Sequence, residues 1–375
     1  MANIDSRIEA AYCERDGDIF VCGLCPHHCR IGEGQTGRCM ARRAEGGTLF
    51  ASSYGKVTSM CVDPMEKKPL YNYMPGKRCL SIGGAGCNMR CLHCQNFAIS
   101  SIPTGRRRST YVSPEDLVAH CRREGLDVIA FTYNEPMIWY EYIRDVAAVD
   151  PDIHIVLVTN GLACEGPLRD LCHIADAMNI DVKGFTEEFY TRECGAHLGD
   201  VLDSVRIVFS EAVHLELTYL VIPGLNDSED EVRAFCFWVA TELSPDVPVH
   251  FTRFHPDYKL TDVPWTPVET VLRCREIGIE EGLNYVYVGN IIAEGPGDTF
   301  CPRCGRPVIR RFGFSVDASE LDGPRCSNCG FDLGIVRRRG PRGSAPGRVP
   351  GTSARRTAPM VLRGPSVSQL PSIRG

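Results

Sequence analysis

Eleven of the 20 cysteines in this 375-residue chain fall into three short groups, and no other sequence feature constrains the fold as strongly. The groups are Cys22, Cys25, Cys29 and Cys39; Cys87, Cys91 and Cys94; and Cys301, Cys304, Cys326 and Cys329. The start of the chain lacks a secretory signal pattern, and no apolar run approaches the roughly 18 residues of a membrane span. We therefore expect a soluble, cytoplasmic protein without membrane contact, whose grouped thiols bind metals or clusters rather than form disulfides.

The other nine cysteines occur singly. A lone cysteine is usually a small buried hydrophobic residue, so we assign these nine no function.

Short apolar, β-branched runs recur along the chain and alternate with segments of helical character. The runs cover residues 79–82, 128–131, 153–158, 178–182, 215–222, 249–251 and 285–288. Two helix starts carry capping signals, Ser113 followed by Pro114 and Ser228 followed by Glu231. Strands alternating with helices predict an α/β fold with a parallel sheet, in the form of a partial, TIM-like (βα)6 barrel of six or so units.

The sequence divides into four predicted regions. They are a four-cysteine module and lead-in at 1–75, the partial barrel at 76–295, a zinc-ribbon-like module at 296–332, and a disordered basic tail at 333–375. The tail holds nine arginines and no lysine or acidic residue, and removing those nine charges from the net charge of −6 leaves −15 on residues 1–332. So acidic a body argues against nucleic acid as the main substrate.

The central cysteine group has the spacing C-x3-C-x2-C and directly follows the first strand of the predicted barrel. Three thiolates at this spacing can hold three corners of a 4Fe–4S cluster and leave one iron open for a ligand. Gly83, Gly84 and Gly86 precede the group and would let the backbone pass close to such a cluster. The alternative is a zinc site of three cysteines completed by His93.

Polar residues follow several other strands of the predicted barrel. These residues are Glu135, Asn160, Lys183 and His255. Because ligands collect at the carboxyl ends of parallel strands, we expect these side chains to converge at one mouth. Each also has a structural interpretation: Glu135 as a helix cap, Asp181 and Lys183 as an ion pair, and His255 as a turn residue.

The two flanking cysteine groups each offer four thiolates. The carboxyl-terminal group consists of two C-x2-C knuckles, each followed by Gly, and predicts a structural zinc ribbon. The amino-terminal group, C-x2-C-x3-C-x9-C, fits either zinc or a second iron–sulfur cluster, with its glycine-rich interval slightly favouring zinc. His27 or His28 could replace one of its cysteines.

Motifs over most of residues 20–300 resemble the radical S-adenosylmethionine (SAM) enzymes, and within them the branch of the pyruvate formate-lyase and other glycyl-radical-enzyme activases. The chain is most similar to the AmmeMemoRadiSam-system radical SAM enzymes. The motifs are CGLCPHHCRIGEGQTGRC, EKKPLYNYMPGKRCLSIGGAGCNMRCLHCQNFAIS, FTYNEP, VTNG, DVKGF, YLVIPGLND and TRFHPDYKL. The resemblance implies an oxidoreductase in which a 4Fe–4S cluster reductively cleaves SAM to a 5′-deoxyadenosyl radical that abstracts hydrogen from a substrate.

The resemblance also implies roles for individual residues. Glu135 would meet the SAM amino group and Lys183 its carboxylate, while Asn160 and His255 would hold the ribose or carboxylate side. Asp181 and Thr159 resemble the oxygen donors of a monovalent-cation site in the activases. The sequence departs from that pattern at Val158, where the activases carry an acidic residue.

The implied partners are an external flavodoxin- or ferredoxin-like electron donor and a substrate protein, with Memo-like and AMMECR-like proteins as further candidates. A different class of function also fits the cysteine count. In that alternative, the chain is a non-catalytic scaffold whose cysteine groups all bind zinc and whose ribbon and basic tail contact protein or nucleic acid.

Overall fold

An eight-stranded sheet forms the centre of the computed structural model, which describes residues 7–101, 109–211, 213–291 and 295–337. In spatial order the strands are β15 (Val286–Gly289), β14 (Val249–Arg253), β13 (His214–Val221), β12 (Ala177–Asp181), β11 (His154–Thr159), β10 (Val128–Phe131), β8 (Arg78–Gly83) and β7 (Ser59–Pro64). The seven strands from β8 to β15 are parallel, which confirms the predicted parallel sheet. One more parallel strand is present than the six or so units predicted. The two edge strands do not pair with each other within the described chain, so the sheet is open.

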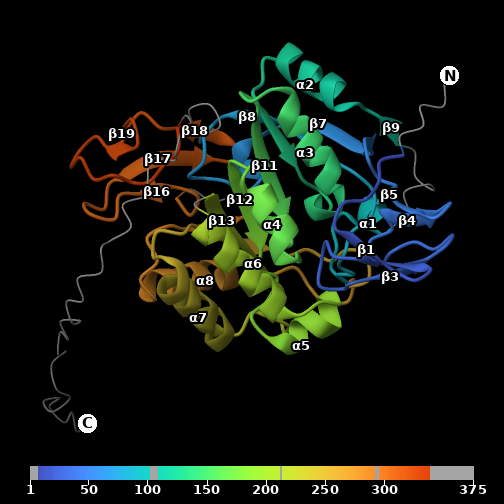
Figure 1. The fold of residues 1–375 in the computed structure, drawn as a ribbon. Coiled ribbons are helices and arrows are strands. Elements are labelled where there is room, and N and C mark those ends of the chain that lie inside the picture. Colours follow the sequence, from blue (N-terminus) through green and yellow to red (C-terminus); the bar gives the residue numbers. More distant parts are fainter. Residues whose placement is uncertain (1–6, 102–108, 212, 292–294, 338–375) are drawn as a thin grey trace, which may run out of the picture. The chain divides into compact units, whose positions relative to one another are not determined.

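Helices cover one face of this sheet (Figure 1). They are α2 (Pro114–Arg123), α3 (Tyr140–Val149), α4 (Glu165–Cys172), α6 (Leu198–Ser210), α7 (Glu229–Trp238) and α8 (Val268–Glu280), with two short helices, α1 (Phe97–Ser100) and α5 (Glu187–Phe189). Both predicted capping residues act as N-caps: Ser113 accepts from the Asp116 amide and Ser228 from the Glu231 amide. Glu231 does not close the capping box, because its carboxylate instead accepts from the Phe185 amide at 2.6 Å.

The central strands are buried on both faces. All four residues of β10, Val-Ile-Ala-Phe, are buried. This is typical of a parallel strand, because such strands are covered on both faces of the sheet. The main apolar cluster joins the strand interiors to the inward sides of α2, α3, α6 and α7. This packing fixes the carboxyl ends of β8 to β14 along one edge.

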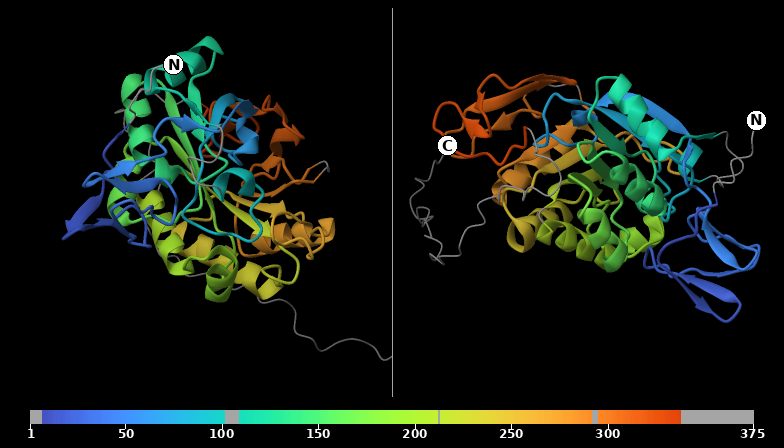
Figure 2. Two further views of the ribbon diagram at one scale, coloured as in Figure 1. Left: turned by 90° about the vertical axis from the view of Figure 1, so that its right-hand side faces the viewer. Right: turned by 45° about the horizontal axis from the view of Figure 1, so that its top comes forward.

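The amino-terminal region is built from short antiparallel strands at one side of the sheet (Figures 1 and 2). The strands are β1 (Cys13–Asp16), β2 (Ile19–Cys22), β3 (Arg30–Gly32), β4 (Arg42–Glu45), β5 (Thr48–Ala51) and β6 (Lys56–Val57), the last paired with β9 (Thr110–Tyr111). Strand β7 also comes from residues 1–75, yet it pairs antiparallel with β8 as an edge of the central sheet. The amino-terminal region therefore supplies a strand to the sheet that the sequence pattern did not reveal.

A buried ion pair ties this region to helix α3. Arg42 Nη1 lies 2.8 Å from Glu141 Oε2, and both side chains are almost wholly excluded from solvent. Glu141 also accepts from the Ala11 amide at 2.8 Å. One carboxylate thus holds two segments of the amino-terminal region against the barrel.

The carboxyl-terminal module contains β16 (Thr299–Phe300), β17 (Pro307–Phe312), β18 (Ser315–Asp317), β19 (Leu321–Asp322) and β20 (Arg325–Cys326). Residues 333–337, assigned above to a disordered tail, are described. Leu333 and Ile335 are buried in the module's core, and Val336 exchanges backbone hydrogen bonds with Asn72 and Met74. That part of the tail prediction is wrong, because the apolar side chains between the last knuckle and the arginines have a core to enter. The rest of the predicted tail, 338–375, lies outside the described residues.

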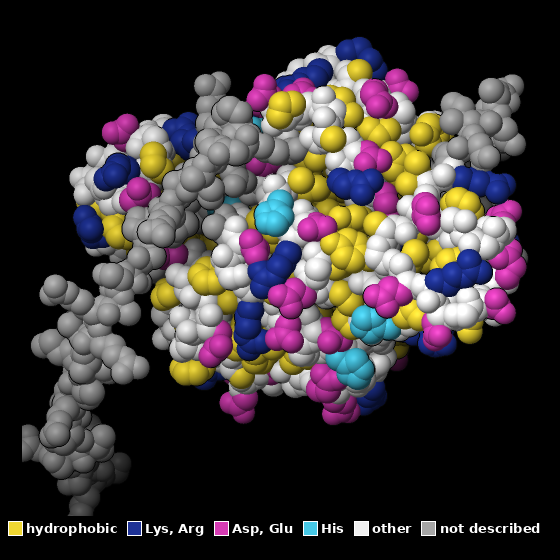
Figure 3. All heavy atoms as spheres, viewed as in Figure 1, with side chains coloured by type: hydrophobic (Ala, Val, Ile, Leu, Met, Phe, Trp, Pro, Cys, Tyr) yellow, Lys and Arg dark blue, Asp and Glu magenta, His cyan; other side chains and the backbone are white. Residues whose placement is uncertain are grey.

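In the stretches that the structure describes, no helix has the length and apolar character needed to cross a bilayer. On the face drawn in Figure 3, acidic and basic side chains are interspersed with apolar ones. That mixed face differs from the basic stripe typical of nucleic-acid-binding surfaces.

Replacing Glu141 with Ala should lower the free energy of unfolding by roughly 3–5 kcal/mol, because the change leaves the Arg42 guanidinium buried without its counter-charge. Chemical denaturation measures the effect. The matched control is Glu188→Ala, which removes an exposed ion pair of the same 2.8 Å length with Arg192 and should change stability by less than about 1 kcal/mol. Equal effects of the two substitutions would contradict this account.

Candidate functional site

The C-x3-C-x2-C loop begins directly after β8, at the edge where the parallel strands end. The three glycines before it are required by neighbouring protein atoms. A Cβ on Gly84 would lie 2.3 Å from the Trp139 indole, and one on Gly86, whose φ is +94°, would lie 2.3 Å from the Cys39 carbonyl oxygen. Asn134 bridges the same turn, accepting from the Gly84 amide and donating to the Gly86 carbonyl, both at 3.0 Å.

A second segment, after β12, holds the loop in place. The Arg90 amide donates to the Cys194 carbonyl at 2.8 Å, and the Leu92 amide donates to the Glu193 carbonyl at 2.9 Å. These two bonds bring Cys194 beside Cys91. Cys194 is one of the nine single cysteines to which no function was assigned above, and no spacing pattern could have identified it, because about a hundred residues separate it from Cys91.

His93 points toward this pair of thiols. Its ligand nitrogen, Cys91 Sγ and Cys194 Sγ lie within 4.8 Å of one another, a set that does not include Cys87 or Cys94. A zinc tetrahedron of His93 with the three loop cysteines is therefore not assembled in the described chain. Burial lowers the pKa of His93 to about 3, so its imidazole is neutral, and neither ring nitrogen has a hydrogen-bond partner.

The other two loop thiols have polar neighbours of their own. Asn160 Nδ2 lies 3.6 Å from Cys87 Sγ, and Ser100 Oγ lies 3.1 Å from Cys94 Sγ. Burial raises the pKa of both thiols, whereas the largest cause of the raised pKa of Cys91 is its hydrogen bond with Cys194. Without a metal these groups stay protonated, and a positive cluster core would be needed to hold them as thiolates.

Glu135 is buried beside this loop and caps the 3₁₀ turn Pro136–Trp139. Its Oε1 accepts from the Met137 amide at 2.8 Å and from the Thr159 hydroxyl at 2.7 Å, and its Oε2 accepts from the Asn160 amide at 2.8 Å. A carboxylate has about four acceptor positions, so Oε2 can still accept one more hydrogen bond. Burial raises the pKa of the Glu135 carboxyl to about 7 despite these three donors.

Asn160 and Thr159 are both committed to neighbouring protein groups. Asn160 donates from Nδ2 to Asn88 Oδ1 at 2.9 Å, and its Oδ1 accepts from the Leu162 amide. The Thr159 hydroxyl donates to Glu135 Oε1 and accepts from the Gly161 amide. Asn160 therefore braces the Cys87 loop, a placement that the sequence analysis did not anticipate.

Asp181 and Lys183 form an ion pair with 3.0 Å between Oδ2 and Nζ. Burial opposes the charge on Lys183, but the Asp181 carboxylate beside it helps to hold the pKa of the ammonium well above its ordinary value. This pairing is the structural interpretation weighed above. It also leaves Lys183 as a cation close to the cysteine loop.

His255 lies after β14 and contacts the end of the cysteine loop. Its Nδ1 is 3.2 Å from Gln95 Nε2, next in sequence to Cys94, and its ring packs on Trp265. The structure thus brings the loop cysteines together with Glu135, Lys183, Asn160 and His255 along one edge of the sheet.

The carboxyl-terminal cysteines surround a single point. Cys301 Sγ lies 3.6 Å from Cys329 Sγ, Cys304 Sγ lies 3.7 Å from Cys326 Sγ, and all four sulfurs lie within 4.8 Å of one another. Four sulfurs bound to one zinc at about 2.3 Å lie about 3.8 Å apart. The Arg306 amide and then Asn328 lower the pKa of Cys304 to about 6, which favours a thiolate.

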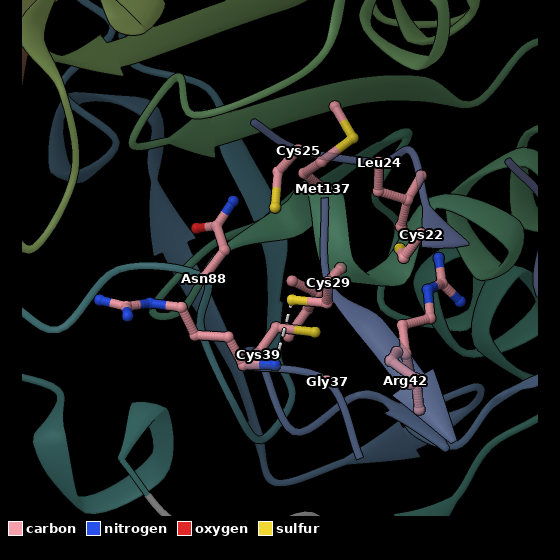
Figure 4. Close-up of a pocket in the computed structure, with 12 residues that line it drawn as sticks. Cys22, Leu24, Cys25, Cys29, Gly37, Cys39, Arg42, Asn88 and Met137 are labelled. Carbon is pink, nitrogen blue, oxygen red and sulfur yellow. Dashed lines mark hydrogen bonds between the residues drawn. The ribbon is translucent and has the colours of Figure 1, made fainter. Parts of the chain in front are cut away.

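The four amino-terminal cysteines line one space together with Met137, which lies in the 3₁₀ turn Pro136–Trp139 (Figure 4). The two histidines proposed as substitutes are directed elsewhere: His27 Nε2 lies 2.9 Å from the Asn88 carbonyl oxygen, and His28 Nε2 lies 3.9 Å from Cys164 Sγ.

Comparison with known proteins adds to this geometry. The family described as the radical SAM superfamily matches residues 81–236, which include the cysteine loop and the strands from β10 to β13. An uncharacterized protein of Methanocaldococcus jannaschii is 41% identical over 333 residues, which cover 88% of this chain and 99% of that protein. The chain belongs to the radical SAM superfamily.

More distant relatives of this radical SAM protein include the pyruvate formate-lyase 1-activating enzyme of Escherichia coli. It is 25% identical over 158 residues, which cover 40% of this chain and 63% of that enzyme. Among solved structures, a radical SAM methyltransferase from Sphaerobacter thermophilus covers 57% of this chain and 66% of its own at 15% identity, with a TM-score of 0.45.

Membership of the superfamily makes the protein an enzyme that uses a 4Fe–4S cluster and SAM, and supports it over the zinc-scaffold alternative. The residues present fit these groups. Three thiols lie in one loop. Beside them, the buried Glu135 carboxyl has one acceptor position left and no salt-bridge partner among the described residues, so it suits an ammonium group.

The raised pKa of Glu135 predicts a pH dependence of stability. Between about pH 4.5 and pH 7 the folded protein holds a proton that the unfolded chain has released. The free energy of unfolding should therefore fall as pH rises through this window, by up to about 3 kcal/mol.

Urea denaturation of the SAM-free protein between pH 5.5 and pH 7.5 measures this slope against that of Glu135→Gln, which has no carboxyl to titrate. The wild type should lose more stability than the variant over this interval. Parallel slopes would show that Glu135 is ionised throughout.

Proposed function

We propose that this protein is an activating-enzyme-like radical SAM enzyme whose cluster is held by Cys87, Cys91 and Cys94. The observation that carries the proposal is the loop itself: three thiols at the carboxyl edge of a parallel sheet, next to the buried Glu135 carboxyl. Three cysteines satisfy three irons of a cubane and leave the fourth for SAM. When bound, the cluster and SAM supply one-electron reductive cleavage of a C–S bond followed by hydrogen abstraction.

The chain's own groups then divide the work of holding SAM. Glu135 would accept a hydrogen bond from the SAM ammonium, whose positive charge would keep the carboxyl ionised. Lys183, held charged by Asp181, would attract the SAM carboxylate. Asn160 acts on the loop, through Asn88 and the Cys87 sulfur, and His255 covers the loop end through Gln95.

The contacts of Thr159 and Asp181 favour roles other than that of ligands in a monovalent-cation site like that of the activases. One is bonded to Glu135 and the other to Lys183, so each already positions a SAM-binding group. Val158 stands where an acidic ligand of that cation site would be expected. We therefore propose positioning roles for both residues.

The carboxyl-terminal module is proposed to hold one structural zinc. Two pairs of its sulfurs lie 3.6 and 3.7 Å apart, close to the roughly 3.8 Å of a tetrahedral zinc site, and a module of about forty residues has too small a core to be stable alone. Tyr285 donates to the Leu333 carbonyl at 2.9 Å, which joins the module to the barrel.

The substrate is proposed to be a partner protein, as the name of the E. coli relative suggests for that enzyme. The resemblance to the AmmeMemoRadiSam system makes Memo-like and AMMECR-like proteins the first candidates, with a flavodoxin- or ferredoxin-like protein as the electron donor. Transfer of deuterium from a labelled partner into 5′-deoxyadenosine would identify the hydrogen donor.

Cys91→Ala should abolish 5′-deoxyadenosine formation by the reconstituted enzyme under anaerobic, reducing conditions, because two thiolates no longer retain the cluster. Product formation is measured by liquid chromatography. Cys61→Ala, which removes an exposed thiol on β7, should leave the rate within about twofold of the wild type. Wild-type activity of the Cys91 variant would refute the proposed ligand set.

Cys194→Ala should keep the cluster but make its reduction potential more negative by tens of millivolts. Once Cys91 is bound to iron as a thiolate, the neighbouring Cys194 thiol would become the hydrogen-bond donor, and a weak bond to the Cys91 sulfur would stabilise the more negative, reduced state. An EPR-monitored redox titration measures the shift, with Cys236→Ala in the barrel core as the control. Loss of the cluster's iron from the Cys194 variant alone would instead make Cys194 a ligand.

A further inference from the structure

We propose that the four amino-terminal cysteines hold a second, fully ligated 4Fe–4S cluster rather than zinc. This site adjoins the SAM site but does not depend on which substrate the enzyme uses.

The spacing of the sulfurs is the first argument. Two sulfurs on one zinc are separated by at most about 4.6 Å, twice a Zn–S bond. The carboxyl-terminal cysteines serve as an internal standard, because two pairs of their sulfurs lie 3.6 and 3.7 Å apart and all four lie within 4.8 Å of one another. Among the described residues, no three of Cys22, Cys25, Cys29 and Cys39 lie within 4.8 Å of one another.

Their directions are the second argument. Figure 4 shows the four side chains around one shared space, and a hole wide enough for a water molecule remains between them. A cubane gives each cysteine its own iron at a separate corner, so its ligand sulfurs stand farther apart than those on a single ion. Wide spacing around a common centre is what such a cluster requires.

Backbone amides donate to all four sulfurs, and such hydrogen bonds would stabilise the sulfurs as metal-bound thiolates. The Arg38 amide donates to Cys29 Sγ at 3.4 Å. The backbone amides of Leu24, His27 and Ala41 donate to the sulfurs of Cys22, Cys25 and Cys39, respectively. Arg42 lines the same space, fully buried, and its Nε and Nη2 have no hydrogen-bond partner. Two unpaired donors at this depth indicate an acceptor that occupies the space.

The location suggests what a cluster here would do. Asn88, next to Cys87, lines the space, and the Cys39 carbonyl packs against Gly86 so closely that a Cβ there would lie 2.3 Å away. The two cysteine groups therefore share a wall. With all four irons ligated by protein, no position is open for SAM, and the chemistry left is one-electron transfer. The cluster would take one electron from the external reduced flavodoxin or ferredoxin and give it up to the neighbouring cluster, with no bond made or broken.

Metal analysis of the full-length triple variant Cys87→Ala/Cys91→Ala/Cys94→Ala tests the proposal. The variant is reconstituted anaerobically with sulfide and equal concentrations of iron and zinc. It should retain about four irons and four sulfides with about one zinc per chain. After reduction it should give an EPR signal that SAM does not change.

The converse variant, Cys25→Ser/Cys29→Ser, should lose about half of the iron and keep the zinc and a SAM-sensitive signal. About two zincs and no iron in the triple variant would overturn the proposal, as would the absence of any metal beyond one zinc. The wild-type iron count, about eight if we are correct and about four if not, does not depend on either variant folding. Failure of the proposed SAM site is distinguishable, because it would appear as a SAM-insensitive signal in the converse variant.

Discussion

Parallel pairing from β8 to β15 is the constraint on which the rest of the structure depends. Backbone hydrogen bonds between these strands, with both faces buried, force their carboxyl ends to the same edge. Residues far apart in sequence, such as Cys87, Glu135 and Lys183, are brought together there by strand pairing rather than by direct contacts between their side chains. Chemistry at this edge is therefore a consequence of the sheet, and loops of different length can vary it.

Several groups near this edge are buried without a full set of partners. Glu135 has no direct cationic partner, His93 has two bare ring nitrogens, and Arg42 has two bare guanidinium nitrogens. Burial of such groups is unfavourable unless a ligand supplies the missing charge or acceptor. The bare nitrogens of His93 and Arg42 lie beside the two cysteine groups, where the proposed clusters would supply such partners.

Much of the fold was predictable because it follows from local patterns. Apolar runs located all seven parallel strands, and the serines at 113 and 228 marked true helix starts. Strand β7 was missed because its exposed residues break the apolar pattern of an interior strand. Asn160 was expected to face SAM, but its side-chain direction depends on Asn88, a neighbour that sequence spacing does not specify.

The sequence by itself determined the composition of each site: three thiols in one loop, two sets of four thiols, and polar residues after the strands. Only the tertiary structure decided the distances between these groups. It separated the amino-terminal sulfurs while gathering the carboxyl-terminal ones, and it placed Cys194 against Cys91. The physical reason is that ligand spacing and hydrogen-bond direction arise from packing between segments distant in the chain, whereas a sequence motif fixes only how many backbone bonds separate its members.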